Sequence, residues 1–235
     1  MGIVAKNSPY ILGIDLGTSN SALAIFVKGE AEIINVDGSK MCPSVFSVRK
    51  DGEILVGQSA RNRICVDPDN TVASIKREMG GGWKKEFPSL PSKEYTPVHI
   101  SAEILSKLVS AAEQAENIDL RGTPVYAVIC IPANFDESQK QATLDAGKQA
   151  NLEVLYLLEE PVAASIAYAL EKERDQTILV YDLGGGTFDV SILEVDSTKR
   201  GPAKFKILAK KGVPKLGGDD FDRKIMEIEI GRAHV

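Results

Sequence analysis

The chain contains the same short turn twice, and this repetition constrains its fold more than any other feature. In each copy an apolar strand ends in an aspartate, a glycine-rich turn with a threonine follows, and a second apolar strand leads away. The copies read Ile11-Leu12-Gly13-Ile14-Asp15-Leu16-Gly17-Thr18 and Leu179-Val180-Tyr181-Asp182-Leu183-Gly184-Gly185-Gly186-Thr187. Either copy alone fits a plain β-hairpin turn, where Asp and Gly are common. Together, in the same Asp-Leu-Gly order, they predict a duplicated fold whose halves face each other across a phosphate.

The residue types in these turns suit a phosphate and a metal ion. Glycine lets the backbone take positive φ and approach a ligand closely, and successive amide groups form a concavity for phosphate oxygens. A threonine hydroxyl can add a further hydrogen bond. Because an aspartate does not favour direct contact with phosphate, Asp15 and Asp182 imply a cation in between. Magnesium fits, since one or two carboxylates, waters and phosphates usually hold it.

Composition and charge exclude several classes of protein. The 235 residues are 43% hydrophobic and 26% charged, which is typical of a globular protein with one large domain or two lobes. The net charge of −5 argues against a nucleic-acid binder. No segment approaches the roughly 18 apolar residues of a membrane span, and no secretory leader is visible. Three widely spaced cysteines, Cys42, Cys65 and Cys130, favour a reducing, cytoplasmic compartment.

The order of the expected elements is typical of an α/β fold, because strands are followed by alternating helices and strands. Strands are expected at Tyr10–Ile14, Ala22–Val27, Ala31–Val36, Val45–Val48, Val125–Ile131, Glu153–Leu158 and from Ile178 onward. Helices are expected from Ser101, from Asp136 or Ser138 to Gln149, over Val162–Lys172 and over Phe221–Ile228. The stretch from Val56 to Pro97 is expected to be an insertion, part helical around Thr71–Met79 and part loop. The opening pattern of strands restarts near residue 178.

Several charged residues carry two possible interpretations. Glu160 lies between a strand end and a helix start, where a carboxylate can orient an attacking water or simply contact the helix dipole. Lys76 either reaches a γ-phosphate or is a solvated helix lysine. The amides of Gly217 and Gly218, before a helix, attract anions, although a simple helix start fits equally well. Five basic residues are expected on solvated faces of a strand pair: Lys199, Arg200, Lys210, Lys211 and Lys215.

Seven motifs together resemble the heat-shock seventy (DnaK-type) chaperones in their order and spacing. They are Gly13 to Ser21, Ile75-Lys76-Arg77, Ile131-Pro132-Ala133, Gln139 to Thr143, Glu160 to Ala164, Asp182 to Val190 and Gly217 to Asp222. The resemblance extends over roughly residues 10 to 226. The Asp-Leu-Gly turn alone is shared with actins and sugar kinases. An actin-like filament protein and a sugar or acetate kinase are therefore the alternative functions.

This resemblance implies an actin-like ATPase (ribonuclease H-like) fold. Lobe I would be nearly complete over residues 1–177, with an inserted subdomain at about 49–115, and lobe II would begin over 178–229. The implied activity is ATP-driven binding and release of unfolded polypeptides. The implied partners of the complete protein are those polypeptides and two kinds of co-chaperone, a J-domain protein and a nucleotide exchange factor, with no nucleic acid and no membrane.

The same resemblance assigns roles at the site. Asp15 and Asp182 would hold hydrated Mg²⁺, and Asp189 would help bind K⁺. Lys76 and Glu160 would place the γ-phosphate and the nucleophilic water, and with Asp182 and Thr187 they form the expected catalytic set. The residues expected to contact ATP or ADP are Gly17, Thr18, Ser19, Asn20, Gly184, Gly185, Gly186, Thr187, Gly217 and Gly218.

The chain departs from the family pattern at three places. Asn134 stands where an aromatic residue is usual, Lys140 replaces an arginine, and Asp219 replaces a glutamate. Lysine lacks the planar fork of arginine. The change at Lys140 therefore bears on the region of Pro132, which would match the family's proline switch between lobes.

The last residues, 230–235, break the helical apolar pattern expected over Phe221–Ile228 and resemble nothing in the family. The family continues well beyond the motif that ends at Asp222, and the codons of Glu229 to Val235 can be written as a common sequencing adapter. From this we expect residues 230–235 to be a non-native tail and the chain as written to be a truncated fragment that is inactive alone.

Overall fold

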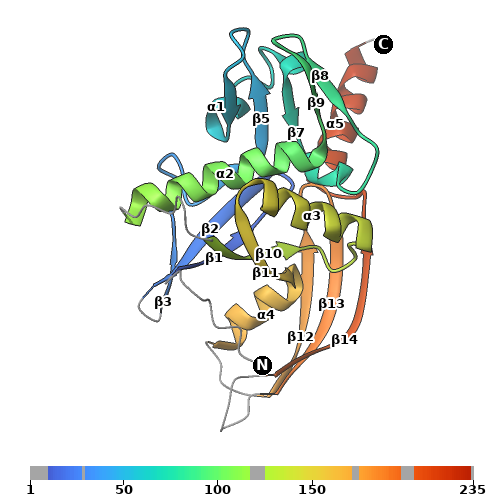
Figure 1. The fold of residues 1–235 in the computed structure, drawn as a ribbon. Coiled ribbons are helices and arrows are strands. Elements are labelled where there is room, and N and C mark those ends of the chain that lie inside the picture. The colour runs from blue at the N-terminus through green and yellow to red at the C-terminus, as the bar shows by residue number, and fades with distance from the viewer. Residues whose placement is uncertain (1–9, 28–29, 117–124, 171–174, 197–203, 234–235) are drawn as a thin grey trace. The chain divides into compact units, whose positions relative to one another are not determined.

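The computed structural model describes residues 10–27, 30–116, 125–170, 175–196 and 204–233 (Figure 1). Its contacts divide the chain into a first unit, Met1–Cys130 with Asp136–Leu157, and a second unit, Ile131–Phe135 with Leu158–Val235. The second unit thus begins at Leu158, whereas the sequence suggested a lobe boundary at 177–178. Lys199 and Arg200 lie outside the described residues.

The first unit is built on a mixed sheet that presents the first acidic turn. Its strands are β1 (Ile11–Asp15), β2 (Asn20–Val27), β3 (Glu30–Ile33), β4 (Cys42–Pro43), β10 (Val125–Ile131) and β11 (Leu152–Glu159). The order is β11-β10-β1-β2-β3, and β4 pairs with β2. β1 runs parallel to β10 and antiparallel to β2. Leu12 and Ile14 are buried while Asp15 is exposed, as the two-residue period of a strand requires. The strand predicted at Val125–Ile131 is confirmed.

Two helices, α2 (Pro97–Glu116) and α3 (Glu137–Gln149), cover this sheet and pack against each other (Figure 1). α2 begins four residues before the predicted Ser101. The reason is local. The Thr96 hydroxyl accepts a hydrogen bond from the His99 amide at 3.3 Å, and Pro97 suits the first helical position because it lacks an amide hydrogen. α3 begins as predicted, with Asp136 and Gln139 forming a reciprocal capping box. Hydrogen bonds from Ser138 and the Gln139 amide lower the pKa of the Asp136 carboxyl.

The segment between β4 and α2 forms small sheets and short turns. Its elements are β5 (Val45–Val48), β6 (Ile54–Val56), α1 (Gln58–Arg61), η1 (Pro68–Asn70), β7 (Thr71–Ala73), η2 (Ile75–Glu78), β8 (Lys85–Phe87) and β9 (Leu90–Tyr95). The helical stretch predicted around Thr71–Met79 is wrong for its first part, which is the strand β7, and is limited to the short 3₁₀ turn η2. Thr71–Ala73 pairs with β5, and the Ser47 and Thr71 hydroxyls are hydrogen-bonded at 3.0 Å. Ser74 then takes a left-handed φ of 54° and leads into a 3₁₀ turn.

An aromatic cluster joins this segment to the core of the first unit. The rings of Phe46, Phe87 and Tyr95 lie 5.2 to 5.6 Å apart. All three side chains are fully buried. The Tyr95 hydroxyl nevertheless finds no hydrogen-bond partner among the described residues. A buried hydroxyl without a partner costs about 1–3 kcal/mol.

Tyr95→Phe is therefore expected to raise the free energy of unfolding by about 1 kcal/mol, because it removes the unpaired hydroxyl and keeps the ring. Tyr95→Ala is the contrasting variant, with an expected loss of about 3–5 kcal/mol from the cavity it leaves. Urea unfolding followed by fluorescence of Trp83, which packs against the same core, measures both. A clear loss of stability in Tyr95→Phe would contradict the assignment of an unpaired hydroxyl.

Cys42 is buried in the first unit, and burial, reinforced by the nearby Asp37 carboxylate, raises the pKa of its thiol to about 11. The thiol is therefore neutral and unreactive at physiological pH. No helix in the described part of the chain is long and apolar enough to cross a membrane.

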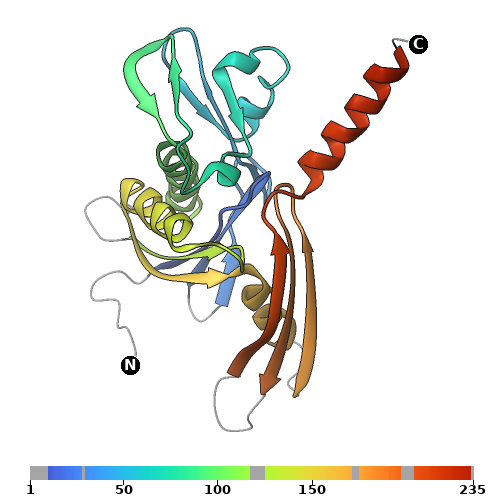
Figure 2. The ribbon, with the colours of Figure 1, turned by 90° about the vertical axis from the view of Figure 1, so that its right-hand side faces the viewer.

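The second unit repeats the strand pattern that opens the first. β12 (Gln176–Leu183), β13 (Phe188–Asp196) and β14 (Lys204–Val213) form an antiparallel meander, as β1, β2 and β3 do. α4 (Glu160–Leu170) packs on this sheet, and this packing places the unit boundary before α4. α5 (Gly218–Ala233) leaves the sheet at the end where β12 turns into β13 (Figure 2). The helix predicted over Phe221–Ile228 thus continues to Ala233, past the expected break at Ile230.

Candidate functional site

The first acidic turn, between β1 and β2, belongs to the first unit. Asp15 and Ser19 are exposed, whereas Thr18 is 9% exposed. A Cβ atom on Gly17 would lie 2.0 Å from the Asn20 carbonyl oxygen. The turn therefore requires glycine because the backbone of Asn20 comes so close. It does not require positive φ, since Gly17 is not among the left-handed glycines of the described chain.

Lys76 lies in the first unit on the 3₁₀ turn η2 and is only 7% exposed. The alternative of a solvated helix lysine is therefore wrong. A buried ammonium group must be compensated by polar partners or an anion. Its burial makes Lys76 a candidate for binding a negatively charged ligand.

The second acidic turn is held to the start of α5 by the backbone. The Gly218 amide donates to the Gly184 carbonyl and the Asp219 amide donates to the Gly185 carbonyl, each at 3.0 Å. A Cβ atom on Gly217 would lie 2.5 Å from the carbonyl of Gly185. The structure thus brings together the two glycine motifs, which are separated in the sequence.

This arrangement changes the role expected for Gly217 and Gly218. The amides of Gly218 and Asp219 are engaged with the turn, and the Gly217 amide donates to the Asp220 carboxylate at 3.0 Å. They cannot also donate to an anion as the sequence suggested. The hydrogen bonds from Gly218 and Asp219 hold the Asp182–Thr187 turn against the start of α5.

Other amides in the two turns meet the requirement for a phosphate. Within the described chain, the amides of Gly185 and Gly186 donate no hydrogen bond, and neither do those of Gly17 and Thr18. Gly186 and Thr18 are buried. Buried backbone donors are almost always satisfied. Each turn is therefore a cradle of unsatisfied donors that fits the oxygens of a phosphate.

Asp182 is the second-last residue of β12, on the approach to its turn, and Asp15 is the last residue of β1. Among the described residues, no three His, Cys, Asp or Glu side chains gather into a metal site. A cation bound by one of these aspartates would take most of its ligands from water and phosphate. Mg²⁺ binds in this way, so the residues present fit that ion.

Asp189 differs from the other two aspartates because it is enclosed. It is 4% exposed, and its Oδ1 accepts a hydrogen bond from Asn134 Nδ2 at 2.5 Å. The pair lies directly against Gly212, where a Cβ atom would be 2.1 Å from Asp189 Oδ1. Asn134 could be recognised in the sequence as a departure from the family, but its partner could not.

Glu160 is half-buried at the first position of α4, which begins two residues before the predicted Val162. The preceding residue, Glu159, accepts a hydrogen bond from Lys210 Nζ at 2.9 Å. Lys210 was expected on a solvated strand face, and it does lie on β14, but its ammonium group also donates to the Ala133 carbonyl at 2.6 Å. Nothing in the sequence pattern indicated these two contacts.

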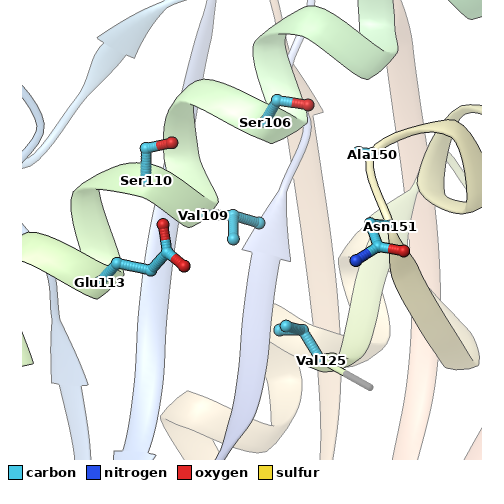
Figure 3. A pocket seen from close by; sticks show the side chains of 7 residues that line it. All are labelled: Ser106, Val109, Ser110, Glu113, Val125, Ala150 and Asn151. Carbon is cyan, nitrogen blue, oxygen red and sulfur yellow. The ribbon is translucent and has the colours of Figure 1, made fainter. Parts of the chain in front are cut away.

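A small cavity of about 180 Å³ in the first unit lies apart from the predicted residues. Ser106, Ser110 and Glu113 of α2 line it opposite Asn151 (Figure 3). None of the residues predicted to bind ATP or a metal lines this cavity.

The predicted residues thus divide between the two units. The first holds Asp15, Gly17, Thr18, Ser19, Asn20 and Lys76, and the second holds Glu160, Asp182, Gly184–Thr187, Asp189, Gly217 and Gly218. Two meanders, each turning at Asp-Leu-Gly with unsatisfied amides, are features of the actin-like ATPases.

A family model described as "Hsp70 protein" matches residues 11–233. The chain therefore belongs to the Hsp70 family and has the actin-like ATPase fold. It is a chaperone ATPase domain, and membership of the family implies nucleotide binding with Mg²⁺. The match decides against the two alternatives, a filament protein and a sugar or acetate kinase.

Proposed function

We propose that this domain binds and hydrolyses ATP in the complete protein, a DnaK-type chaperone of the cytoplasm. The unsatisfied amides in both acidic turns carry the proposal, because two separate turns offer phosphate cradles of the same design. The full protein would use the cycle to bind and release unfolded polypeptides, with a J-domain protein and a nucleotide exchange factor as co-chaperones.

In this proposal each residue acts through groups that the structure defines. The amides of Gly17, Thr18, Gly185 and Gly186 donate to phosphate oxygens, and the Thr18 and Thr187 hydroxyls add hydrogen bonds. Asp15 and Asp182 hold hydrated Mg²⁺, which neutralises phosphate charge when bound. Lys76 supplies a buried positive charge for the γ-phosphate.

Glu160 and Asp189 have different roles in the proposal. The Glu160 carboxylate orients the attacking water, which is the positioning task that phosphoryl transfer requires. Asp189 contributes its carboxylate to a K⁺ site. Gly217 and Gly218 act indirectly, by fixing the turn that carries Gly185 and Gly186.

Asp182→Asn is the variant that tests the metal assignment. Calorimetry should show ATP binding that Mg²⁺ strengthens in the natural protein. In the variant most of that strengthening should be lost, about tenfold in affinity or about 1.4 kcal/mol, because a hard cation site loses a negative charge. Asp196→Asn, an exposed aspartate at the far end of β13, is the matched control and should leave binding unchanged.

Two outcomes would contradict the proposal at different levels. An Asp182→Asn protein with natural Mg²⁺ dependence would remove Asp182 from the metal site. A natural protein without measurable ATP binding would overturn the proposed function itself.

A further inference from the structure

Three segments of the second unit meet at the ammonium group of Lys210. This lysine lies on β14, where it pairs with Ser191 of β13. Its Nζ atom donates to the Ala133 carbonyl at 2.6 Å and to Glu159 Oε1 at 2.9 Å. Ala133 belongs to the short connection Ile131–Phe135, and Glu159 is the last residue of β11.

The connection Ile131–Phe135 occupies an unusual place in the chain. By its contacts it belongs to the second unit, although most of β10 before it and all of α3 after it belong to the first. Two side chains tie it to the sheet of the second unit. One is Lys210, and the other is Asn134, which donates to Asp189 on β13. Ala133 itself is 4% exposed.

Glu159 is held in a position that depends on Lys210. Its Oε2 atom is buried and has no hydrogen-bond partner among the described residues, so within the described chain the carboxylate is held through Oε1, by Lys210. A carboxylate that loses its cation while one oxygen is buried is driven to turn toward solvent. Because Glu160 is the next residue in the chain, a movement of Glu159 moves the start of α4 as well.

We propose that Lys210 is a positioning residue for the hydrolysis reaction: by joining Ala133 and Glu159 it fixes the backbone from which Glu160 projects. The inference rests on the proposed function, since it assigns Glu160 to the attacking water. The Lys210 side chain is 37% exposed. An ion pair as exposed as the one between Lys210 and Glu159 contributes little to the free energy of unfolding. Its main effect is therefore on local geometry.

The test is Lys210→Met, which keeps the apolar stem and removes the charge and the donors. The expected result is a five- to tenfold lower kcat for ATP hydrolysis with KM changed less than twofold, because orientation of the water is lost and binding is not. Lys210→Arg should recover a large part of kcat, since it restores a cation with several donors.

The neighbouring Lys211 supplies the matched control. It is exposed on the same strand, and its side chain makes no hydrogen bond or ion pair among the described residues. Lys211→Met changes the net charge equally and should keep natural kcat and KM. Glu159→Ala completes the design: if Lys210 acts through Glu159, the double variant should lose no more kcat than Lys210→Met alone.

The possible outcomes distinguish a failure of the positioning role of Lys210 from a failure of the proposed function. If the natural protein hydrolyses ATP and Lys210→Met matches Lys211→Met in kcat, the positioning role is overturned and the proposed function stands. If Lys210→Met raises KM and lowers kcat together, or Lys210→Arg recovers nothing, the positioning role is also overturned. If the natural protein neither binds nor hydrolyses ATP, the proposed function fails and the positioning role fails with it. Hydrogen exchange of the amides at 133–135, 159 and 160 would then show whether the Lys210 contacts exist.

Discussion

Replacing Gly217 with alanine is expected to lower the free energy of unfolding of the second unit by about 3 kcal/mol or more. The added methyl group would lie 2.5 Å from the carbonyl carbon and oxygen of Gly185 and 2.6 Å from the Gly186 nitrogen. These are backbone atoms, which cannot rotate away as a side chain can. Overpacking of this kind costs about 1–3 kcal/mol and occasionally more. The hydrogen bonds from Gly218 and Asp219 to the turn should weaken as well.

Gly218→Ala is the matched control for this prediction. A methyl group there would lie 3.8 Å from the Gly185 Cα atom, which is ordinary van der Waals contact. Because Gly218 begins α5, alanine should be neutral or stabilise the helix by up to about 1 kcal/mol. The two adjacent residues therefore separate a requirement for space from a general preference for glycine.

Urea unfolding followed by circular dichroism and by Trp83 fluorescence measures both variants. Trp83 is the sole tryptophan and packs in the first unit. Its transition therefore reports on that unit, and the remaining loss of ellipticity reports on the second. Gly217→Ala should also weaken ATP binding, since the shape of the Gly185–Gly186 cradle depends on it. Equal stability of the two alanine variants would contradict this account of the turn.

The parts of the fold that sequence could predict are those with local causes. The strand at Val125–Ile131 is an uninterrupted apolar run, and the Asp136 cap follows from hydrogen bonds three residues away. The repeated Asp-Leu-Gly turn was visible for the same reason. Thr71–Ala73 was misassigned to a helix because pairing with β5, a non-local contact, decides its conformation.

In the candidate site, too, features with local causes could be predicted and those set by non-local contacts could not. The glycines were recognised, but the reason for Gly17 and Gly217 is the close approach of another part of the backbone, which no local pattern reveals. The contact between Asn134 and Asp189 joins residues 55 positions apart, and that between Lys210 and Ala133 joins residues 77 apart. Side chains that act across such separations can be assigned only once the fold is known.

Lys76→Met and Glu160→Gln are expected to slow single-turnover ATP hydrolysis about a hundredfold while changing ADP affinity less than about threefold. ADP lacks the γ-phosphate on which both residues are proposed to act, so its binding does not depend on them. Removal of one charged group that stabilises the transition state typically costs about 10²–10³ in rate. Interactions made only in the transition state lower the rate without weakening the ground state.

The choice of variants protects this test from simple misfolding. Methionine keeps the buried stem of Lys76, which is only 7% exposed, and glutamine keeps the shape of Glu160. Lys50→Met and Glu153→Gln change exposed residues of the same types and should leave both measurements unchanged. If hydrolysis and ADP affinity fell by the same factor, Lys76 and Glu160 would have structural roles. A rate loss confined to hydrolysis requires that both residues act on the γ-phosphate or the water, since a distorted turn would weaken ADP as well.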